Sequence, residues 1–244
     1  MNTNPLLVDG LSYCYGALKA LDNVSFAIAP ATCVGLLGAN GSGKTTLFGL
    51  LTRLLSPATG DIKVFDQNLS HSPGSALQNL GVVFQQSSLD LDLSVVQNLN
   101  YHAALQGMDR KLARQRIIEE LKRFKLENRA NDRVRQLNQG HRRRVEIARA
   151  LLHKPRLLLL DEATVGLDFE TRQMLNTHIR SLCETEGISV LWATHLVEDI
   201  ELDDNIIWLQ DGQVMAQGVC RTLLENSQEP NLQELLQHLS REGL

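Results

Sequence analysis

A glycine-rich stretch at residues 38–45 restricts this chain more than any other part of its sequence. It reads Gly-Ala-Asn-Gly-Ser-Gly-Lys-Thr, follows the apolar run 33–37 and opens a helical pattern at Lys44. Glycines let the backbone curl so that successive N–H groups point inward at phosphate oxygens. The helix that follows adds the positive end of its dipole. The pattern G-x-x-x-x-G-K-[S/T] between a strand and a helix therefore predicts a phosphate-binding loop for a nucleotide.

Individual residues of this loop have expected roles. The Lys44 ammonium should reach the β- and γ-phosphates, and the Thr45 hydroxyl should bind Mg²⁺. The other nucleotide-binding residues that we predict in and after the loop are Gly38, Asn40, Gly41, Ser42, Gly43 and Thr46.

Two adjacent carboxylates, Asp161 and Glu162, come directly after the apolar run 157–160. Neighbouring residues of a strand point to opposite sides, so two acids at the end of a strand can do two jobs. By itself such a pair more often caps a helix. In a chain that has a phosphate loop, the pair predicts that Asp161 holds Mg²⁺ and that Glu162 orients and deprotonates the attacking water.

The pattern of apolar runs predicts an α/β fold with a helical insertion. Strand-like runs lie at 24–28, 33–37, 62–65, 81–84, 157–160, 189–192 and 206–209, and several are apolar without alternation, as expected for strands covered on both faces. Helical patterns lie at 44–54 and 169–183, and a dense helical stretch runs from 95 to about 152. Because the strand rhythm lapses there, we interpret this stretch as a helical subdomain inserted into an α/β core.

We therefore expect one domain over 1–244. It would have a nucleotide-binding core at 1–85 and 154–217, a helical subdomain at 86–153 and a C-terminal helical extension at 218–244. Asp211-Gly212, between two short apolar runs, predicts a tight hairpin turn. In the extension, Leu232, Leu235, Leu236 and Leu239 have helical spacing, which predicts a terminal helix packed on the body.

Composition predicts a soluble protein of a reducing compartment. Hydrophobic residues make up 43% of the chain, and no apolar run has the length of a membrane span. We expect no secretory signal in residues 1–9, and the four scattered cysteines favour the cytoplasm over a disulfide framework. Residues 110–149 hold fourteen of the 24 Lys and Arg with only five acids, although the whole chain carries −4. Such a basic segment indicates either an anionic partner surface or solvated helix faces.

Four further segments resemble the ABC (ATP-binding cassette) ATPases. They are Gly81-Val-Val-Phe-Gln85, similar to the family's Q-loop; residues 137–151, beginning Leu-Asn-Gln-Gly-His, similar to the signature L-S-G-G-Q and its helix; Asp161-Glu-Ala-Thr-Val-Gly-Leu-Asp168, similar to D-E-P-T-x-G-L-D; and Ala193-Thr-His195, similar to the switch histidine. Order and spacing match from about residue 6 to 217. The resemblance implies a P-loop NTPase (RecA-like) core with an N-terminal antiparallel β subdomain and an inserted α-helical subdomain.

The resemblance also implies an ATP-hydrolysing activity with ATP and Mg²⁺ as ligands. Tyr15 matches the aromatic residue that stacks on adenine. Gln85 matches the residue that touches Mg²⁺ or the attacking water, and His195 matches the donor to the γ-phosphate. The implied catalytic residues are Glu162, His195, Gln85 and Lys44, and the implied metal-binding residues are Thr45, Gln85 and Asp161.

Members of this family work as head-to-tail dimers, in which ATP lies between the phosphate loop of one subunit and the signature of the other. The resemblance therefore implies that Asn138 and Gly140 bind ATP held by a second ATP-binding subunit. We expect a homodimer and leave a heterodimer open. The motif departs from L-S-G-G-Q at three positions, which puts the strength of the ATP sandwich in question, whereas Ala163 in place of proline is a minor change.

Further partners implied by the resemblance are integral-membrane permease subunits, which would hold the chain peripherally at the cytoplasmic face of the cell (inner) membrane. Residues 88–95 look most like the drug and sodium exporter branch, so export is favoured over import. One alternative is a soluble ABC-type ATPase acting on DNA or ribosomes, but the overall acidity disfavours nucleic acid as a partner. Another is a nucleotide-sensing module with low turnover, which the altered signature suggests and which Glu162, His195 and Gln85 argue against.

Overall fold

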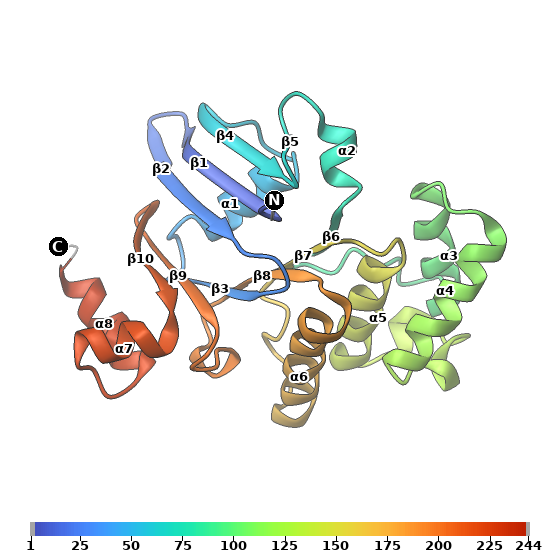
Figure 1. Ribbon diagram of the computed structural model, residues 1–244. Helices are drawn as coiled ribbons and strands as arrows, with labels where there is room; N and C mark the ends of the chain where they lie inside the picture. The colour runs from blue at the N-terminus through green and yellow to red at the C-terminus, as the bar shows by residue number, and fades with distance from the viewer. Residues whose placement is uncertain (1–2, 243–244) are drawn as a thin grey trace.

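The computed structural model describes residues 3–242 and contains two β-sheets with helices around them (Figure 1). The first is an antiparallel sheet in the order β2-β1-β4-β5, and the second is a six-stranded sheet in the order β10-β9-β3-β8-β7-β6. The strands are β1 (Leu6–Tyr15), β2 (Leu18–Ile28), β3 (Cys33–Leu37), β4 (Thr59–Val64), β5 (Gln67–Asn68), β6 (Leu80–Val83), β7 (Leu157–Asp161), β8 (Ser189–Thr194), β9 (Asn205–Gln210) and β10 (Gln213–Val219). All neighbours in the second sheet are parallel except β9 and β10.

The central strands are buried on both faces, which explains why their sequences do not alternate. On β7, Leu157 and Leu159 pack into the core beneath the antiparallel sheet. Buried residues of helix α1 (Lys44–Leu51) belong to the same core. The next side chains along β7, Leu158 and Leu160, pack on the opposite face against the helices. Every residue of β7 is therefore buried, and its carboxyl end delivers the acidic pair to the edge of the sheet.

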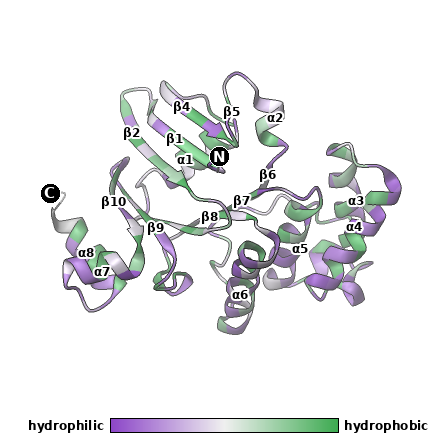
Figure 2. Ribbon diagram, viewed as in Figure 1, coloured by the Kyte–Doolittle hydropathy of each residue, from purple (hydrophilic) through white to green (hydrophobic). Residues whose placement is uncertain are grey.

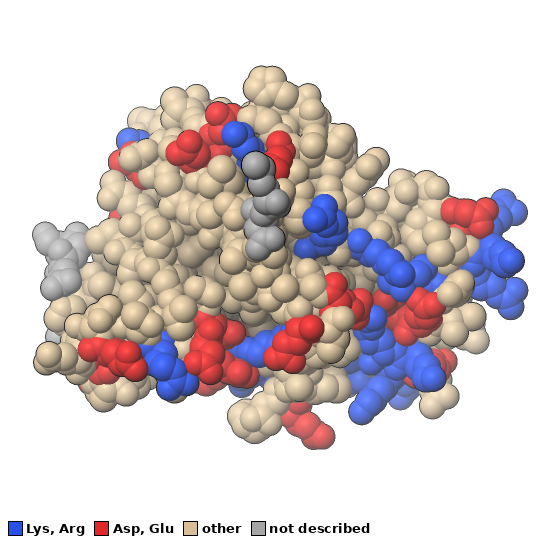
Figure 3. Space-filling model, viewed as in Figure 1, with Lys and Arg blue, Asp and Glu red and all other residues tan. Residues whose placement is uncertain are grey.

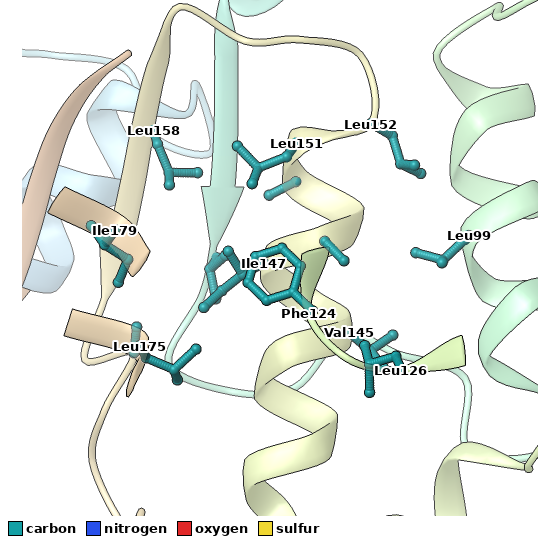
Figure 4. Packing of buried hydrophobic residues seen from close by; sticks show 14 of the residues in the cluster. Leu99, Phe124, Leu126, Val145, Ile147, Leu151, Leu152, Leu158, Leu175 and Ile179 are labelled. Atoms are coloured by element: carbon teal, nitrogen blue, oxygen red, sulfur yellow. The ribbon is translucent and has the colours of Figure 1, made fainter. Parts of the chain in front are cut away.

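The second face of the sheet is covered by helices of the insertion and by one helix of the core, α6. They are α3 (Val95–Leu105), α4 (Arg110–Arg123), α5 (Gln139–Leu151) and α6 (Phe169–Glu186), with 3₁₀ turns at Glu127–Arg129 and Val134–Gln136 between α4 and α5. Figure 4 shows Leu99, Val145 and Ile179 of three different helices meeting in one apolar cluster. Figure 2 shows hydrophobic and hydrophilic residues mixed along these helices, as expected when each helix buries one apolar stripe.

Polar side chains begin these helices at the positions that helix capping requires. Ser94 and Gln97 form a reciprocal capping box at the start of α3, and Asp109 accepts two backbone N–H bonds at the start of α4. The dense helical stretch expected from 95 to about 152 consists of three helices, α3, α4 and α5, with turns between them. Helix α1 ends at Leu51, earlier than the expected 54, because Arg53 has left-handed backbone geometry with φ 61°.

The hairpin expected at Asp211-Gly212 joins β9 to β10. Both turn residues have positive φ, 48° and 78°, as a type I′ turn requires. The chain then forms α7 (Cys220–Ser227) and α8 (Leu232–Glu242). The short helix α2 (Pro73–Leu77) lies earlier in the chain, between β5 and β6. Leu232, Leu235 and Leu236 of α8 are buried against the sheet. The α/β fold with an antiparallel subdomain and a helical insertion is confirmed, while the exact residue boundaries of its parts stay predictions.

Surface charge is uneven over this fold. On the face drawn in Figure 3, Lys and Arg are densest at the right, over the helical insertion, which is the part of the chain that contains the basic segment 110–149. Among the helices of the described region, none is both long and apolar enough to cross a bilayer.

Candidate active site

The phosphate loop connects β3 to α1 at the carboxyl edge of the parallel sheet. Gly43 precedes α1 with φ 108°, a conformation that L side chains rarely adopt. A Cβ at this residue would lie 2.8 Å from the Ala20 carbonyl oxygen, so only glycine fits. The curl of the loop therefore depends on the backbone freedom of Gly43 and on the close approach of β2.

Two polar groups of the loop are arranged for an anion. Lys44 is buried, and its Nζ donates hydrogen bonds to the carbonyl oxygens of Gly38 at 2.7 Å and Ala39 at 3.0 Å. Burial lowers the pKa of Lys44, and the nearby carboxylates of Glu162 and Asp161 raise it in part. The Ser42 Oγ is buried and has no hydrogen-bond partner among the described residues. A phosphate in the loop would give this hydroxyl an acceptor and the ammonium a counter-charge.

Tyr15 shares a hollow with the phosphate loop. The hollow has a volume of about 450 Å³, and its lining includes Tyr15, Ala20, Gly41, Gly43, Thr45 and Thr46. Tyr15 is half exposed at the end of β1, and its ring packs edge-on against Tyr13 with centroids 4.9 Å apart. An aromatic face beside a phosphate loop suits a base attached to the phosphates. The role of Tyr15 in adenine stacking stays a prediction that this arrangement supports.

The acidic pair lies where β7 ends. Asp161 is buried, and burial raises its pKa to about 6; the neighbouring Glu162 adds to the rise, and Lys44 and Arg143 oppose it. Glu162 has left-handed backbone geometry, with φ 49°, and its N–H donates to the Ala193 carbonyl of β8 at 2.9 Å. Such a conformation costs a non-glycine residue about 1–3 kcal/mol and is often found at functional sites.

The Glu162 carboxylate is held by two side chains that lie far away in the sequence. Gln85 Nε2 donates to Glu162 Oε2 at 2.8 Å, and His195 Nδ1 lies 3.1 Å from Glu162 Oε1. Because the carboxylate oxygen accepts, the hydrogen of this second bond is on Nδ1 of His195. Three of the four residues predicted as catalytic are therefore in direct contact within one chain, and the fourth, Lys44, is near enough for the carboxylate to shift its pKa.

The residues predicted to bind Mg²⁺ have suitable chemistry. Asp161 offers a carboxylate, Thr45 a hydroxyl and Gln85 an amide oxygen, and Mg²⁺ prefers such oxygen ligands. A buried carboxylate with a raised pKa gains most from a cation beside it. Two or three protein ligands suffice, because Mg²⁺ keeps waters and takes phosphate oxygens as its other ligands.

The signature residues contact another part of the chain. Asn138 caps α5, and Gly140 follows in its first turn, where a Cβ would lie 3.0 Å from Cγ2 of Thr171 in α6. Gln139 Nε2 donates to the Val165 carbonyl oxygen at 3.1 Å. The beginning of α5 is therefore attached to the loop between β7 and α6 and to α6 of its own chain.

Arg143 is a site residue that the sequence interpretation did not single out. It lies on α5, only 7% exposed, and donates to the Phe84 carbonyl at 2.8 Å and the Gln85 carbonyl at 3.1 Å. The signature helix thus holds the backbone of Gln85. Three consecutive arginines conceal this role, but helical spacing indicates it, because Arg143 shares the buried stripe of Gly140 and Ile147.

Comparison with known proteins agrees with this fold and site. A family model described as ABC transporter matches residues 21–165. The Nod factor export ATP-binding protein I of Cupriavidus metallidurans is 35% identical over 213 residues, which cover 87% of this chain and 70% of the relative. The chain therefore belongs to the ABC transporter ATP-binding family, whose members are ATPases.

Two solved structures support the same assignment. One, an ATP-binding subunit of an ABC transporter, superimposes with a TM-score of 0.86 at 25% identity and covers 96% of this chain and 99% of its own. The other is a dimeric ATP-binding cassette in a post-hydrolysis state bound to ADP and Pi, with a TM-score of 0.79, 29% identity and coverage of 88% of this chain and 99% of its own. The sequence-based identification of an ABC ATP-binding subunit with ATPase activity is confirmed.

Proposed function

We propose that this chain is the ATP-hydrolysing subunit of an exporter, and that ATP-driven closure of a dimer moves separate membrane subunits. The observation that carries the proposal is the contact of Glu162 with Gln85 and His195 beside the phosphate loop. A module that only sensed nucleotide would need no positioned base. Export is supported by the relative named for Nod factor export and by the exporter-like residues 88–95.

The chemistry follows from the positions of these side chains. The loop N–H groups and Lys44 neutralise the β- and γ-phosphates, and Thr45 and Asp161 would hold Mg²⁺, which would supply further positive charge beside the phosphates. Glu162 accepts a proton from the attacking water, and His195 donates to the γ-phosphate. Gln85 contacts both this centre and, through its backbone, the signature helix. Gln85 can therefore report the state of the nucleotide to the helical insertion.

A second ATP-binding subunit would complete the site. The dipole at the start of α5 favours an anion, so Asn138 and Gly140 of one copy would bind the γ-phosphate held by the other. ATP binding then stabilises the closed dimer, and the loss of the γ-phosphate on hydrolysis releases it.

The altered signature keeps one side-chain donor available. Asn138 Oδ1 accepts from the His141 backbone N–H at 2.8 Å and lies 2.6 Å from His141 Nδ1. Since a backbone N–H can only donate, the capping atom is the amide oxygen, and the hydrogen of the second bond is on Nδ1. The Asn138 Nδ2 group is left free to donate to phosphate across the interface. Gln139 instead adds a side chain where the family has none.

We expect conversion of this motif to the family form to tighten dimerisation. The change is Asn138→Ser, Gln139→Gly and His141→Gln together, made in the Glu162→Gln background so that ATP is not consumed. One recovered charge-assisted hydrogen bond contributes about 1.5–3 kcal/mol, or roughly ten- to a hundred-fold in affinity. ATP-dependent dimer formation by analytical ultracentrifugation measures the effect. Unchanged or weaker dimerisation would mean that Asn138 and His141 already make an equivalent contact set.

A hollow on the helical insertion is a suitable docking place for the membrane subunit. It has a volume of about 650 Å³ and is lined by residues that include Gln78, Gln106, Met108, Leu112, Leu152 and Lys154. The lining joins the insertion to the turn before β6, so a segment seated there contacts both parts of the ATPase. The lining includes the exposed Lys154, and the hollow belongs in part to the basic segment 110–149, which suits a position beside an anionic membrane surface.

The test of the proposal is isolation of the tagged full chain from membranes of its own cells. We expect a polytopic membrane protein to co-purify and to stimulate ATP hydrolysis. Leu112→Asp should reduce this association by about thirty-fold or more, because a charge in an apolar contact loses its hydration. Ile118→Asp is the matched control, since it is also an exposed apolar residue of α4 but lies away from the hollow's lining. Co-purification with DNA or ribosomes instead would favour a soluble ATPase.

A further inference from the structure

We propose that Asp199 is a positioning residue for hydrolysis, whose buried carboxylate fastens the loop of Glu162 to the loop of His195. Asp199 is fully buried, at 0% exposed, in the 3₁₀ turn Val197–Asp199 after the switch histidine. Neither the phosphate loop nor the catalytic carboxylate is among its hydrogen-bond partners in the described region. Its proposed effect therefore passes through the two loops.

The carboxylate joins two hydroxyls from different segments at one oxygen atom. Thr164 Oγ1 donates to Asp199 Oδ2 at 2.6 Å, and Thr194 Oγ1 donates to the same atom at 2.7 Å. Thr164 lies two residues after Glu162, and Thr194 comes directly before His195. One buried acceptor thus fixes the distance between the segments that carry the base and the histidine.

The same network closes the turn around His195. The Leu196 N–H donates to Thr194 Oγ1 at 3.0 Å, and the Asp199 N–H donates to the Leu196 carbonyl at 3.2 Å. The residues on both sides of His195 are therefore held by hydrogen bonds that end on Asp199. None of these hydrogen bonds is made by the side chain of His195.

Helix α6 holds Asp199 from behind. Asn176 Nδ2 donates to Asp199 Oδ1 at 3.2 Å, and Arg180 Nη2 donates to the Asp199 carbonyl at 2.7 Å. Arg180 is also ion-paired with Asp204 and Glu201, which keeps its guanidinium in place. Both carboxylate oxygens of Asp199 are therefore occupied, and the two catalytic loops are fixed to one rigid helix.

A consequence is that the acceptor atoms matter more than the charge. The Asn176 Oδ1 is buried and has no hydrogen-bond partner among the described residues. In Asp199→Asn, the new amide oxygen can keep both threonine hydroxyls, and its Nδ2 can donate to Asn176 after that amide rotates. Asp199→Ala leaves both hydroxyls without an acceptor and frees the two loops.

The experiment compares kcat, the ATP dissociation constant and the melting temperature of full-length variants. We expect Asp199→Ala to lower kcat by about thirty-fold with ATP affinity within about threefold, since a misplaced base affects the reaction and not binding. Asp199→Asn should recover kcat to within about fivefold of the parent. Asp203→Ala is the control, because Asp203 lies on the same segment in an exposed ion pair with Arg221.

Single hydroxyl deletions keep the test decisive if Asp199→Ala does not fold. Thr164→Val and Thr194→Val each remove one hydroxyl hydrogen bond to Asp199 and leave the contacts of Asp199 with α6. Each variant should therefore have a lower kcat and an unchanged affinity for ATP. A spectroscopic readout is the ¹⁵N shift of His195 Nδ1, which should change in both variants because its bond to Glu162 is disturbed. Unchanged kcat in the variants, or an Asp199→Asn variant as slow as Asp199→Ala, would overturn the inference.

The inference rests on the proposed roles of Glu162 and His195, and the two can fail separately. Glu162→Gln is measured beside the Asp199 variants. If Glu162→Gln turned over ATP normally, the proposed roles would be wrong. If Glu162→Gln were inactive while the threonine and Asp199 variants behaved like the parent, only the positioning role of Asp199 would fail.

Discussion

Replacing Glu162 by Gln is expected to slow ATP hydrolysis by about two to four orders of magnitude, the usual contribution of a general base. The amide has the shape of the carboxylate, so it can still accept from Gln85, which donates to Glu162 at 2.8 Å in the parent. ATP should therefore bind as before, and only proton removal from the attacking water is lost.

The second observable of this variant is its assembly. Since hydrolysis no longer removes the γ-phosphate, we expect an ATP-dependent dimer that persists on size-exclusion chromatography under conditions where the parent dissociates. Glu225→Gln is the matched control, because Glu225 is exposed on α7, away from the site. A Glu162→Gln variant that stayed monomeric at saturating ATP would contradict either the base assignment or the closure of a dimer on ATP.

Lys44→Ala should abolish ATP hydrolysis, with a loss of at least about a hundredfold, because no other side chain of the loop brings a cation to the β- and γ-phosphates. The change also removes the two bonds from Nζ to the Gly38 and Ala39 carbonyls, which leaves the loop less ordered. We therefore expect weaker ATP binding as well as lost turnover, in contrast to Glu162→Gln.

Phosphate release and equilibrium binding of a fluorescent ATP analogue separate these two effects. Lys63→Ala is the control, an exposed lysine on β4 of the antiparallel sheet. A melting temperature close to that of the parent would establish that Lys44→Ala is folded. Turnover near the parental rate would remove Lys44 from the proposed mechanism.

Signals that act within a few residues could be interpreted from the sequence. Residue 43 has a φ of 108°, a conformation that glycine adopts without strain. Asp211-Gly212 forms the expected turn because both residues tolerate positive φ. The apolar run at 157–160 predicted a strand buried on both faces, and its packing on two separate cores agrees. Each of these features depends on backbone sterics or on the period of a strand, which a short segment carries by itself.

Contacts between segments that lie far apart in the sequence could not be predicted from local patterns. The bonds of Glu162 to Gln85 and His195 join residues 77 and 33 positions apart, and only the family resemblance indicated that they would meet. The helical spacing of Arg143 with Gly140 and Ile147 places it on the buried stripe of α5, but the sequence does not show that its partner there is the Gln85 backbone. Asp199 likewise lies in a polar segment that reads as an ordinary surface loop.

The sequence by itself determined the phosphate loop, the strand that carries the acidic pair and the α/β fold with its helical insertion. It did so because glycine geometry, strand period and helix spacing are local properties. Only the tertiary structure decided that Glu162 adopts a left-handed backbone, that Arg143 holds the Gln85 backbone and that Asp199 joins two loops. The physical reason is that a buried polar group needs partners, and which partners it finds depends on how the strands and helices pack.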